Sequence, residues 1–194
     1  MQATYPLASS TWGDEELIAI QEVMDSGRFT MGPKVFAFEK EFATKFGATD
    51  AVMVNSGSTA NLLMLSLLKW KYNLNKKPKA NVIVPTVGWS TTYFPVTQND
   101  FILNFVDVDP DTFNIDITKI EQAIDKDTVA IMPVNLCGNS CDYDALTSIC
   151  KKHDLVLIED NCESMGATYN DKYCGTHGMM GSHSFFFSHH LQTM

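Results

Sequence analysis

The sequence predicts an α/β protein with a mostly parallel sheet that is covered by helices on both faces. Short apolar runs rich in β-forming residues begin roughly 20–30 residues apart, which is the spacing of strand–helix–strand units and not of hairpins. Several runs are apolar throughout, such as VIVP, VAIMPV and LVLI, as is typical of strands buried on both faces. We therefore expect strands at residues 51–55, 81–85, 101–108, 129–136, 155–158 and 184–187.

Helices are expected in the gaps between these runs. Thr11 and Asp14 resemble a capping box, and the apolar residues that follow recur at helical spacing up to Gly27. Phenylalanines four residues apart predict a second helix, which ends at Phe46 just before a glycine. Three more helices are predicted at residues 59–70, 116–124 and 142–152, and residues 73–79 are expected to form a polar loop.

The composition is that of a globular protein, with 45% hydrophobic and 19% charged residues among 194. With 14 Lys and Arg against 23 Asp and Glu, the net charge is −9, and no basic cluster indicates a nucleic-acid partner. No apolar run approaches the ~20 residues of a membrane span, and the N-terminus lacks the features of a signal peptide. Five cysteines without a CxxC pair indicate reduced thiols. We therefore expect a cytoplasmic protein.

The segment NSGSTAN, residues 55–61, follows an apolar run and opens a predicted helix. Unpaired backbone N–H groups and the positive end of the helix dipole make such a helix start suitable for binding phosphate. Gly57 would let the backbone approach a ligand closely, and Ser58 would add a hydroxyl donor. Neither a Walker motif nor a GxGxxG motif is present. The alternative interpretation is that Ser58 simply caps the helix.

Polar and aromatic side chains follow two other predicted strands. Glu159 and Asp160 lie at the carboxyl end of a strand, where open α/β sheets bind ligands, and their side chains should point to opposite faces. One carboxylate could hold a protonated ring nitrogen, or it could cap the following turn. Trp89 lies past the end of another strand, where its ring could stack on a planar cofactor or pack in the core.

Two histidines, His189 and His190, come directly after the predicted strand at residues 184–187 and a serine. Either could act as a general base near neutral pH. Metal binding is the competing interpretation. Adjacent residues of a strand would diverge, however, and neither an HExxH motif nor a nearby carboxylate supports a metal. We therefore expect a general base and no metal site.

Together and in this order, the motifs resemble those of the DegT/StrS-type sugar aminotransferases, which are pyridoxal 5'-phosphate (PLP) enzymes of the aspartate-aminotransferase fold, PLP fold type I. The resemblance runs over residues 6–194. Its landmarks are GP at 32–33, FE at 38–39, SGSTAN, VPTVGW, DVDPDTFNID, PVNLCGNSCDYDAL, IEDNCESMGATY and SHSFFFSHH.

The resemblance implies a domain organisation. Residues 1–194 would be the N-terminal and large cofactor-binding domain, which is incomplete, and the C-terminal small domain would be absent from this chain. The chain also stops directly after a strand-like run, without a helix to cover it. Members of the family build their site between two subunits, so we expect a homodimer.

The resemblance also implies roles for five residues that bind the cofactor. Gly57 and Ser58 match the phosphate-binding turn, and Ser184 matches a second phosphate ligand. Trp89 matches the aromatic residue that stacks on the pyridine ring, and Asp160 matches the aspartate that pairs with the ring nitrogen.

Two positions depart from the common pattern of the family. Glu163 stands where most members have glutamine, near the phenolic oxygen of the cofactor. His189 stands in the position of the lysine that normally binds the cofactor covalently, and no lysine follows Lys172. The resemblance therefore implies that His189 is the catalytic base.

A histidine at position 189 resembles the subgroup that removes the 3-hydroxyl group from nucleotide-linked 4-keto-6-deoxy sugars during synthesis of lipopolysaccharide or capsule. This subgroup uses pyridoxamine 5'-phosphate (PMP), with glutamate as the amino donor. One imidazole can take up a proton and then deliver it to the departing hydroxyl group, because its pKa lies near neutrality. The motifs do not distinguish GDP from CDP as the nucleotide.

Three alternatives stay open. The first is an iron–sulfur, CDP-linked 3-dehydrase, in which a cysteine matching Cys162 would hold the cluster. The second is an ordinary nucleotide-sugar aminotransferase, which would need a lysine elsewhere. The third is an inactive cofactor-binding fragment.

Overall fold

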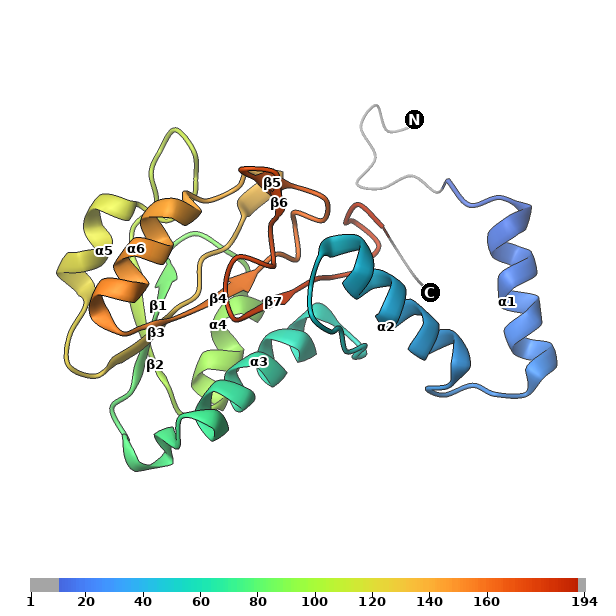
Figure 1. Ribbon diagram of the computed structural model, residues 1–194, viewed down its shortest axis with the longest axis horizontal. Coiled ribbons are helices and arrows are strands. Elements are labelled where there is room, and N and C mark those ends of the chain that lie inside the picture. The colour runs from blue at the N-terminus through green and yellow to red at the C-terminus, as the bar shows by residue number, and fades with distance from the viewer. Residues whose placement is uncertain (1–10, 192–194) are drawn as a thin grey trace, which may run out of the picture. The chain divides into compact units, whose positions relative to one another are not determined.

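The computed structural model describes residues 11–191, which belong to two compact units, Met1–Met53 and Val54–Met194 (Figure 1). The N-terminal segment considered for a signal peptide, the beginning of the family resemblance at residue 6 and the chain end at Met194 lie outside the described residues. Within residues 11–191, no helix has the length and apolar character that a membrane crossing requires.

The first unit begins with helix α1, Asp14–Ser26, which ends as predicted at Gly27 in the left-handed conformation with φ of 65°. The predicted cap at Thr11 is wrong. The residue before the helix is Gly13, and its N–H donates to the Glu16 carboxylate at 2.7 Å. The capping pair therefore lies two residues further along the chain, because an acidic side chain in the first turn reaches back to the free N–H group.

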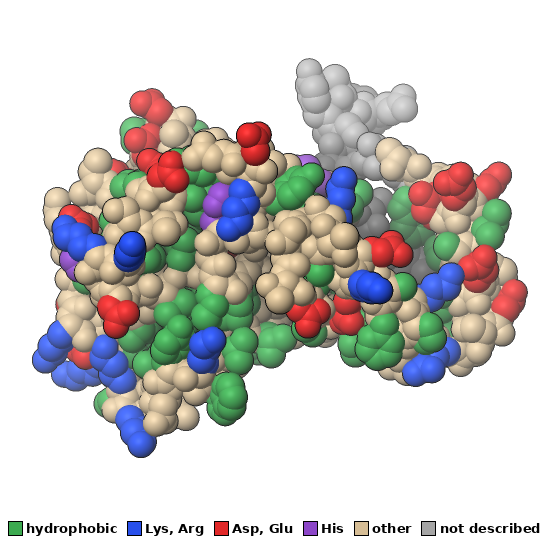
Figure 2. All heavy atoms as spheres, viewed as in Figure 1, with side chains coloured by type: hydrophobic (Ala, Val, Ile, Leu, Met, Phe, Trp, Pro, Cys, Tyr) green, Lys and Arg blue, Asp and Glu red, His purple; other side chains and the backbone are tan. Residues whose placement is uncertain are grey.

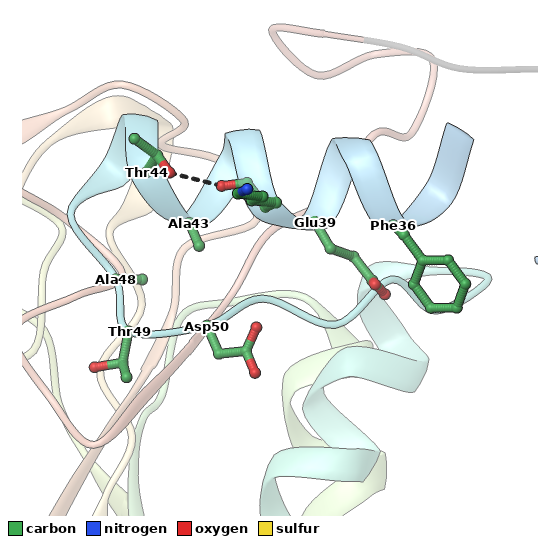
Figure 3. Close-up of a pocket in the computed structure, with 8 residues that line it drawn as sticks. Phe36, Glu39, Ala43, Thr44, Ala48, Thr49 and Asp50 are labelled. Atoms are coloured by element: carbon green, nitrogen blue, oxygen red, sulfur yellow. Dashed lines mark hydrogen bonds between the residues drawn. The ribbon is translucent and has the colours of Figure 1, made fainter. Parts of the chain in front are cut away.

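Helix α2, Pro33–Phe46, follows in the same unit and ends at Gly47. Its Phe38, Phe42 and Phe46 rings pack in sequence, with centroids 5.5 and 4.4 Å apart. A shallow hollow of about 330 Å³ lies between α2 and residues 48–50. Figure 3 shows the residues that line it, and none of them is a predicted site residue.

The expected strand at residues 51–55 is wrong, because these residues form no ladder with another strand in the described part of the chain. Side-chain carboxylates accept hydrogen bonds from backbone N–H groups that would otherwise donate to a neighbouring strand. The Ala51 N–H donates to Asp50 at 2.9 Å, and the Met53 N–H donates to Glu39 at 2.7 Å. The apolar run therefore has strand character without a strand partner.

The second unit contains the predicted sheet, whose five strands run parallel in the order β2-β1-β3-β4-β7. Four expected strands are confirmed: β1 Asn81–Pro85, β2 Ile102–Val106, β3 Thr128–Ile131 and β4 Val156–Asp160. The bounds change little except at β3, which ends five residues before the expected end at residue 136. The fifth, β7 Met180–Ser182, lies before the expected strand at residues 184–187, which is wrong. There the chain turns back on itself, and the His189 N–H donates to the Phe186 carbonyl at 2.9 Å.

Helices cover both faces of this sheet, as predicted (Figure 1). On one face, α3 Gly57–Lys71 and α4 Ser90–Gln98 pack against alternate strand residues such as Val82 and Ile158. On the other face, α5 Ile117–Ala123 and α6 Tyr143–His153 pack against Ile83, Ile131 and Leu157. This alternation explains the continuously apolar strands, since each strand fills two cores.

The sequence did not predict helix α4 or the short elements of the second unit. These are the 3-10 turns η1 Leu74–Lys76 and η2 Leu136–Gly138 and the antiparallel pair β5 Thr168–Tyr169 and β6 Lys172–Tyr173. On the face drawn in Figure 2, Lys and Arg side chains are interspersed with Asp and Glu side chains.

All five strands end at the same edge of the sheet because they run parallel. The chain passes from β1 to β2 in one direction along the sheet, and β3 then lies on the other side of β1. Loops that follow the strands on either side of such a reversal diverge and leave room for a ligand. The residues predicted for the site in the second unit end β4, follow β1, β4 or β7, or begin α3.

Candidate functional site

Asp160 is the last residue of β4 and is buried, with 4% of its surface exposed. Its Oδ2 accepts hydrogen bonds from Asn61 Nδ2 at 2.8 Å and from Thr92 Oγ1 at 2.7 Å. Its Oδ1 accepts from the Cys162 N–H at 3.2 Å and from the Ser182 hydroxyl at 3.5 Å. The Ser182 hydroxyl lies equally far, at 3.5 Å, from the Glu159 carbonyl and has only one hydrogen to give. Among residues 11–191 no Lys or Arg forms an ion pair with Asp160, so neutral donors, Asn61, Thr92 and the Cys162 N–H above all, stabilise the carboxylate.

Asn61 and Thr92 belong to this site but were not predicted as part of it. Asn61 lies one turn into α3, and Thr92 lies in the first turn of α4. The only signal for Asn61 in the sequence is its place in the SGSTAN motif. Thr92 has no such signal, because the sequence does not predict the helix that carries it.

Glu159, the neighbour of Asp160, points to the other face of the sheet, as strand geometry predicts. Its carboxylate is fully buried and accepts from the N–H groups of Gly175 at 2.6 Å and Gly178 at 2.5 Å. Glu159 therefore fixes the loop before β7, and of the two carboxylates only Asp160 belongs to the candidate site.

The start of α3 packs directly against the segments that follow β4 and β7. A Cβ atom at Gly57 would lie 2.8 Å from the Cys162 sulfur and 2.9 Å from Ser184 Cβ, so only glycine fits. The close contact brings together Gly57 and Ser184, which the sequence predicted as parts of one phosphate site. Ser184 is buried, and its hydroxyl accepts from the Phe186 N–H at 3.3 Å.

Two questions left open by the sequence concern Ser58 and Trp89. The residue that caps α3 is Ser56, whose hydroxyl accepts from the Thr59 N–H at 3.1 Å. The capping interpretation of Ser58 is therefore wrong, and Ser58 lies exposed in the first turn. Trp89 precedes α4 with 70% of its surface exposed, so the core-packing interpretation is wrong too.

Glu163 lies in the loop after β4, where it is half-buried. Its carboxylate accepts a hydrogen bond from the Cys137 N–H at 3.1 Å. This contact ties the loop after β4 to the turn η2 that follows β3. The proposed role of Glu163 near a cofactor oxygen stays a prediction.

His189 and His190 follow β7 in a turn and not in a strand. His189 is half-buried, and its ring centroid lies 5.7 Å from that of Phe186, whereas His190 is exposed. The expectation that the two side chains diverge as in a strand therefore has no basis in the structure. The catalytic role of His189 stays a prediction.

His183 is a third histidine near this edge of the sheet, between Ser182 and Ser184. Burial lowers its pKa to about 4, although attraction to Asp160 acts to raise it. Its Nδ1 lies 3.3 Å from Asn161 Nδ2, which also donates to the carbonyls of Ser164 and Cys174. Asn161 Nδ2 carries only two hydrogens and cannot bond all three neighbours at once, but a proton on Nδ1 would place one donor against another. The ring is neutral at neutral pH.

All five cysteines are free thiols, in agreement with the expectation from their spacing. Cys162 lies beside Gly57 and Ser182, and burial, with Asp160 nearby, raises the pKa of its thiol. The described residues contain no group of three or more His, Cys, Asp or Glu side chains arranged to hold a metal.

A parallel α/β sheet with a buried aspartate at a strand end, beside a glycine-containing helix start, is the arrangement that the resemblance to PLP enzymes of fold type I implied. Comparison with known proteins agrees. Residues 11–194 match the DegT/DnrJ/EryC1/StrS aminotransferase family, and the chain belongs to this family.

Three relatives illustrate the similarity. GDP-4-keto-6-deoxy-D-mannose 3-dehydratase from Yersinia pseudotuberculosis is 54% identical over 194 residues, covering 98% of this chain and 48% of the relative. A crystal structure of GDP-4-keto-6-deoxymannose-3-dehydratase with a trapped PLP-glutamate geminal diamine has a TM-score of 0.93 and 51% identity, covering 98% of this chain and 50% of the other. A crystal structure of a histidine-to-asparagine mutant of GDP-4-keto-6-deoxymannose-3-dehydratase with bound GDP-perosamine has a TM-score of 0.93 and 50% identity. The match covers 97% of this chain and 49% of the other. The chain thus spans about half the length of these relatives.

Proposed function

We propose that this chain forms the cofactor-binding part of a PLP- and PMP-dependent enzyme that removes the 3-hydroxyl group of a nucleotide-linked 4-keto-6-deoxy sugar. The observation that carries the proposal is the buried Asp160 carboxylate, which has neutral donors and no Lys or Arg partner among the described residues. A protonated pyridine ring would supply the missing positive charge.

The residues of the site fit such a cofactor at three points. The first N–H groups of α3 and the hydroxyls of Ser58 and Ser184 can bind the phosphate. Asp160 can hold the ring nitrogen in its protonated form, and the exposed Trp89 ring is free to stack on the cofactor. When bound, PMP supplies the amine that condenses with the sugar ketone and a ring that takes up negative charge.

His189 supplies the proton transfers in this proposal. It would take a proton near the cofactor and then deliver it to the departing 3-hydroxyl group. His183 is the other histidine at this edge, but its pKa is lowered to about 4 and its Nδ1 faces the amide nitrogen of Asn161. The relative with a histidine replaced by asparagine, bound to GDP-perosamine, supports a histidine at the sugar-binding site.

The substrate and partners follow from the same comparison. GDP-4-keto-6-deoxy-mannose is the proposed substrate, because relatives at 54% and 51% identity carry this activity in their names. Glutamate is the proposed amino donor, since one relative holds a PLP-glutamate adduct. We also propose a homodimer, because a stacking Trp89 that is 70% exposed needs further protein to enclose the cofactor. The proposed role is in the cytoplasmic synthesis of lipopolysaccharide or capsule sugars.

Titration of the intact protein with PLP, followed by visible absorbance and borohydride reduction, tests the proposal. We expect saturable binding and no cofactor fixed to the chain by borohydride, because His189 replaces the lysine. Absence of binding would favour an inactive fragment, and a lysine adduct found by mass spectrometry would favour an ordinary aminotransferase. Stoichiometric iron in anaerobically purified protein would favour the CDP-linked iron–sulfur enzyme instead.

A further inference from the structure

The Asp160 carboxylate is bound unequally at its two oxygens. Oδ2 accepts two short hydrogen bonds, at 2.7 Å from Thr92 and 2.8 Å from Asn61. The contacts of Oδ1 are longer, at 3.2 Å from the Cys162 N–H and 3.5 Å from Ser182. Oδ2 is therefore fully engaged, and Oδ1 keeps the capacity to accept a further, stronger hydrogen bond.

The amide of Asn61 is fixed in one orientation. The side chain is 1% exposed, and Nδ2 also donates to the Thr91 carbonyl at 3.2 Å. Rotating the amide would point its oxygen at the carboxylate and at that carbonyl, and acceptor would then face acceptor. Asn61 thus presents a donor, and only a donor, to Asp160.

This orientation leaves Asn61 Oδ1 buried without a hydrogen-bond partner among the described residues. A buried acceptor without a partner lowers stability, and an apolar side chain of similar size would avoid that cost. Packing alone therefore does not account for asparagine at this position, whereas the bond from Nδ2 to Asp160 does.

We propose that Asn61 and Thr92 are positioning residues that hold the Asp160 carboxyl group in one rotamer, with Oδ1 presented to the ring nitrogen of the cofactor. This inference rests on the proposed function. Hydrogen bonds donated to a carboxylate favour its charged form, and no Lys or Arg in the described part of the chain forms an ion pair with it. The two neutral donors fix Oδ2 without competing with the cofactor as a cation would.

The test compares Thr92→Val, Thr92→Ser and Asn61→Ala in the intact protein. Thr97→Val is the matched control, because Thr97 lies on the same helix and its hydroxyl donates to the Phe94 carbonyl. For each variant we measure the Kd for PLP, kcat and KM for the sugar, and the pH at which the absorbance of the bound cofactor changes as its ring nitrogen loses a proton.

Thr92→Val and Asn61→Ala should each raise the Kd for PLP about tenfold, the effect of losing one hydrogen bond to a charged group. They should lower kcat with little change in KM and move the absorbance transition about one pH unit lower. Thr92→Ser, which keeps the hydroxyl, and Thr97→Val should both behave like the wild type. If Asn61→Ala does not fold, the comparison of Thr92→Val with Thr92→Ser decides alone.

If Thr92→Val keeps the Kd, the kcat and the absorbance transition of the wild type, the inference is overturned, because the Thr92 hydroxyl would then have only a structural role. An equal effect in Thr97→Val would also overturn it, since the loss would then follow from any hydroxyl removed from α4. Failure of the wild-type protein to bind PLP would overturn the proposed function itself and is thereby distinguishable.

Discussion

Protonation of His183 is expected to destabilise the second unit in mild acid. The half-buried ring packs against Gly175, where a Cβ atom would lie 2.7 Å from its Nε2. Its Nδ1 faces the Asn161 amide nitrogen, a donor held in place because Asn161 Oδ1 accepts from Asn135 at 3.0 Å. A proton on Nδ1 would set two donors against each other at a position largely withdrawn from solvent.

The magnitude follows from the pKa of His183, which burial lowers from 6.5 to about 4 in the folded protein. Between these values the unfolded chain binds the proton and the folded chain does not, so the free energy of unfolding falls as the pH falls. Each pH unit is worth about 1.4 kcal/mol, so the loss amounts to about 3 kcal/mol from above pH 6.5 down to pH 4. Below pH 4 the folded ring also takes up the proton and this contribution becomes flat.

Equilibrium urea unfolding, followed by circular dichroism between pH 7 and pH 4, measures this loss. His183→Asn removes the titrating ring, so the fall in stability between pH 7 and pH 4 should be smaller by about 3 kcal/mol. At pH 7 the variant should be less stable than the wild type, because asparagine leaves space beside Gly175. His190→Asn, at an exposed position, is the control and should keep the full fall.

An unchanged pH dependence in His183→Asn would refute the reasoning, because it would show that the buried ring does not exclude the proton. The same result would weaken the choice of His189 over His183 as catalytic base, which depends on His183 being held neutral.

Substitutions elsewhere in the site should separate packing, charge and proton transfer. Gly57→Ala would place a Cβ atom 2.8 Å from the nearest sulfur, so urea unfolding should show a loss of about 1–3 kcal/mol and the Kd for PLP should rise; an unchanged Kd would contradict the close contact. Asp160→Asn should lower kcat far more than Glu163→Gln, because only a carboxylate keeps the ring nitrogen protonated; equal small losses would show that Asp160 is not its partner. His189→Asn should abolish dehydration and leave PLP binding nearly intact, whereas His190→Asn should be mild, and the reverse order in turnover assays would assign the base to His190.

Much of the second unit could be predicted from the sequence because its strands are buried on both faces. The continuous apolar runs at β1 and β4 mark a central position in a parallel sheet without reference to any partner. The run at residues 51–55 has similar composition but no ladder, because strand formation depends on a neighbour that local composition does not reveal. Helix α4 was missed because its threonines and Pro95 are poor helix formers, and its packing against α3 outweighs this preference.

The residues of the candidate site differ in the same way: local sequence predicts some of them, and only the fold reveals the others. Gly57, Asp160 and Ser184 could be predicted because each lies at a helix start or beside a strand end, positions that the order of motifs already indicates. Asn61 and Thr92 could not, since an asparagine or a threonine inside a helix acquires a role only from the group it meets across the fold. The hydrogen bonds from Thr92 and Asn61 to Asp160 span 68 and 99 positions of the chain, respectively.

The proposed function requires that a site with His189 in place of the cofactor-binding lysine removes a sugar hydroxyl group with a PLP-derived cofactor. The most direct measurement is to incubate the intact protein with PLP, glutamate and GDP-4-keto-6-deoxy-mannose and to follow the sugar by nuclear magnetic resonance and mass spectrometry. The account predicts loss of the 3-hydroxyl group, with consumption of glutamate to regenerate PMP, and no such loss in His189→Asn. Accumulation of a 4-amino sugar that retains its 3-hydroxyl group would contradict it.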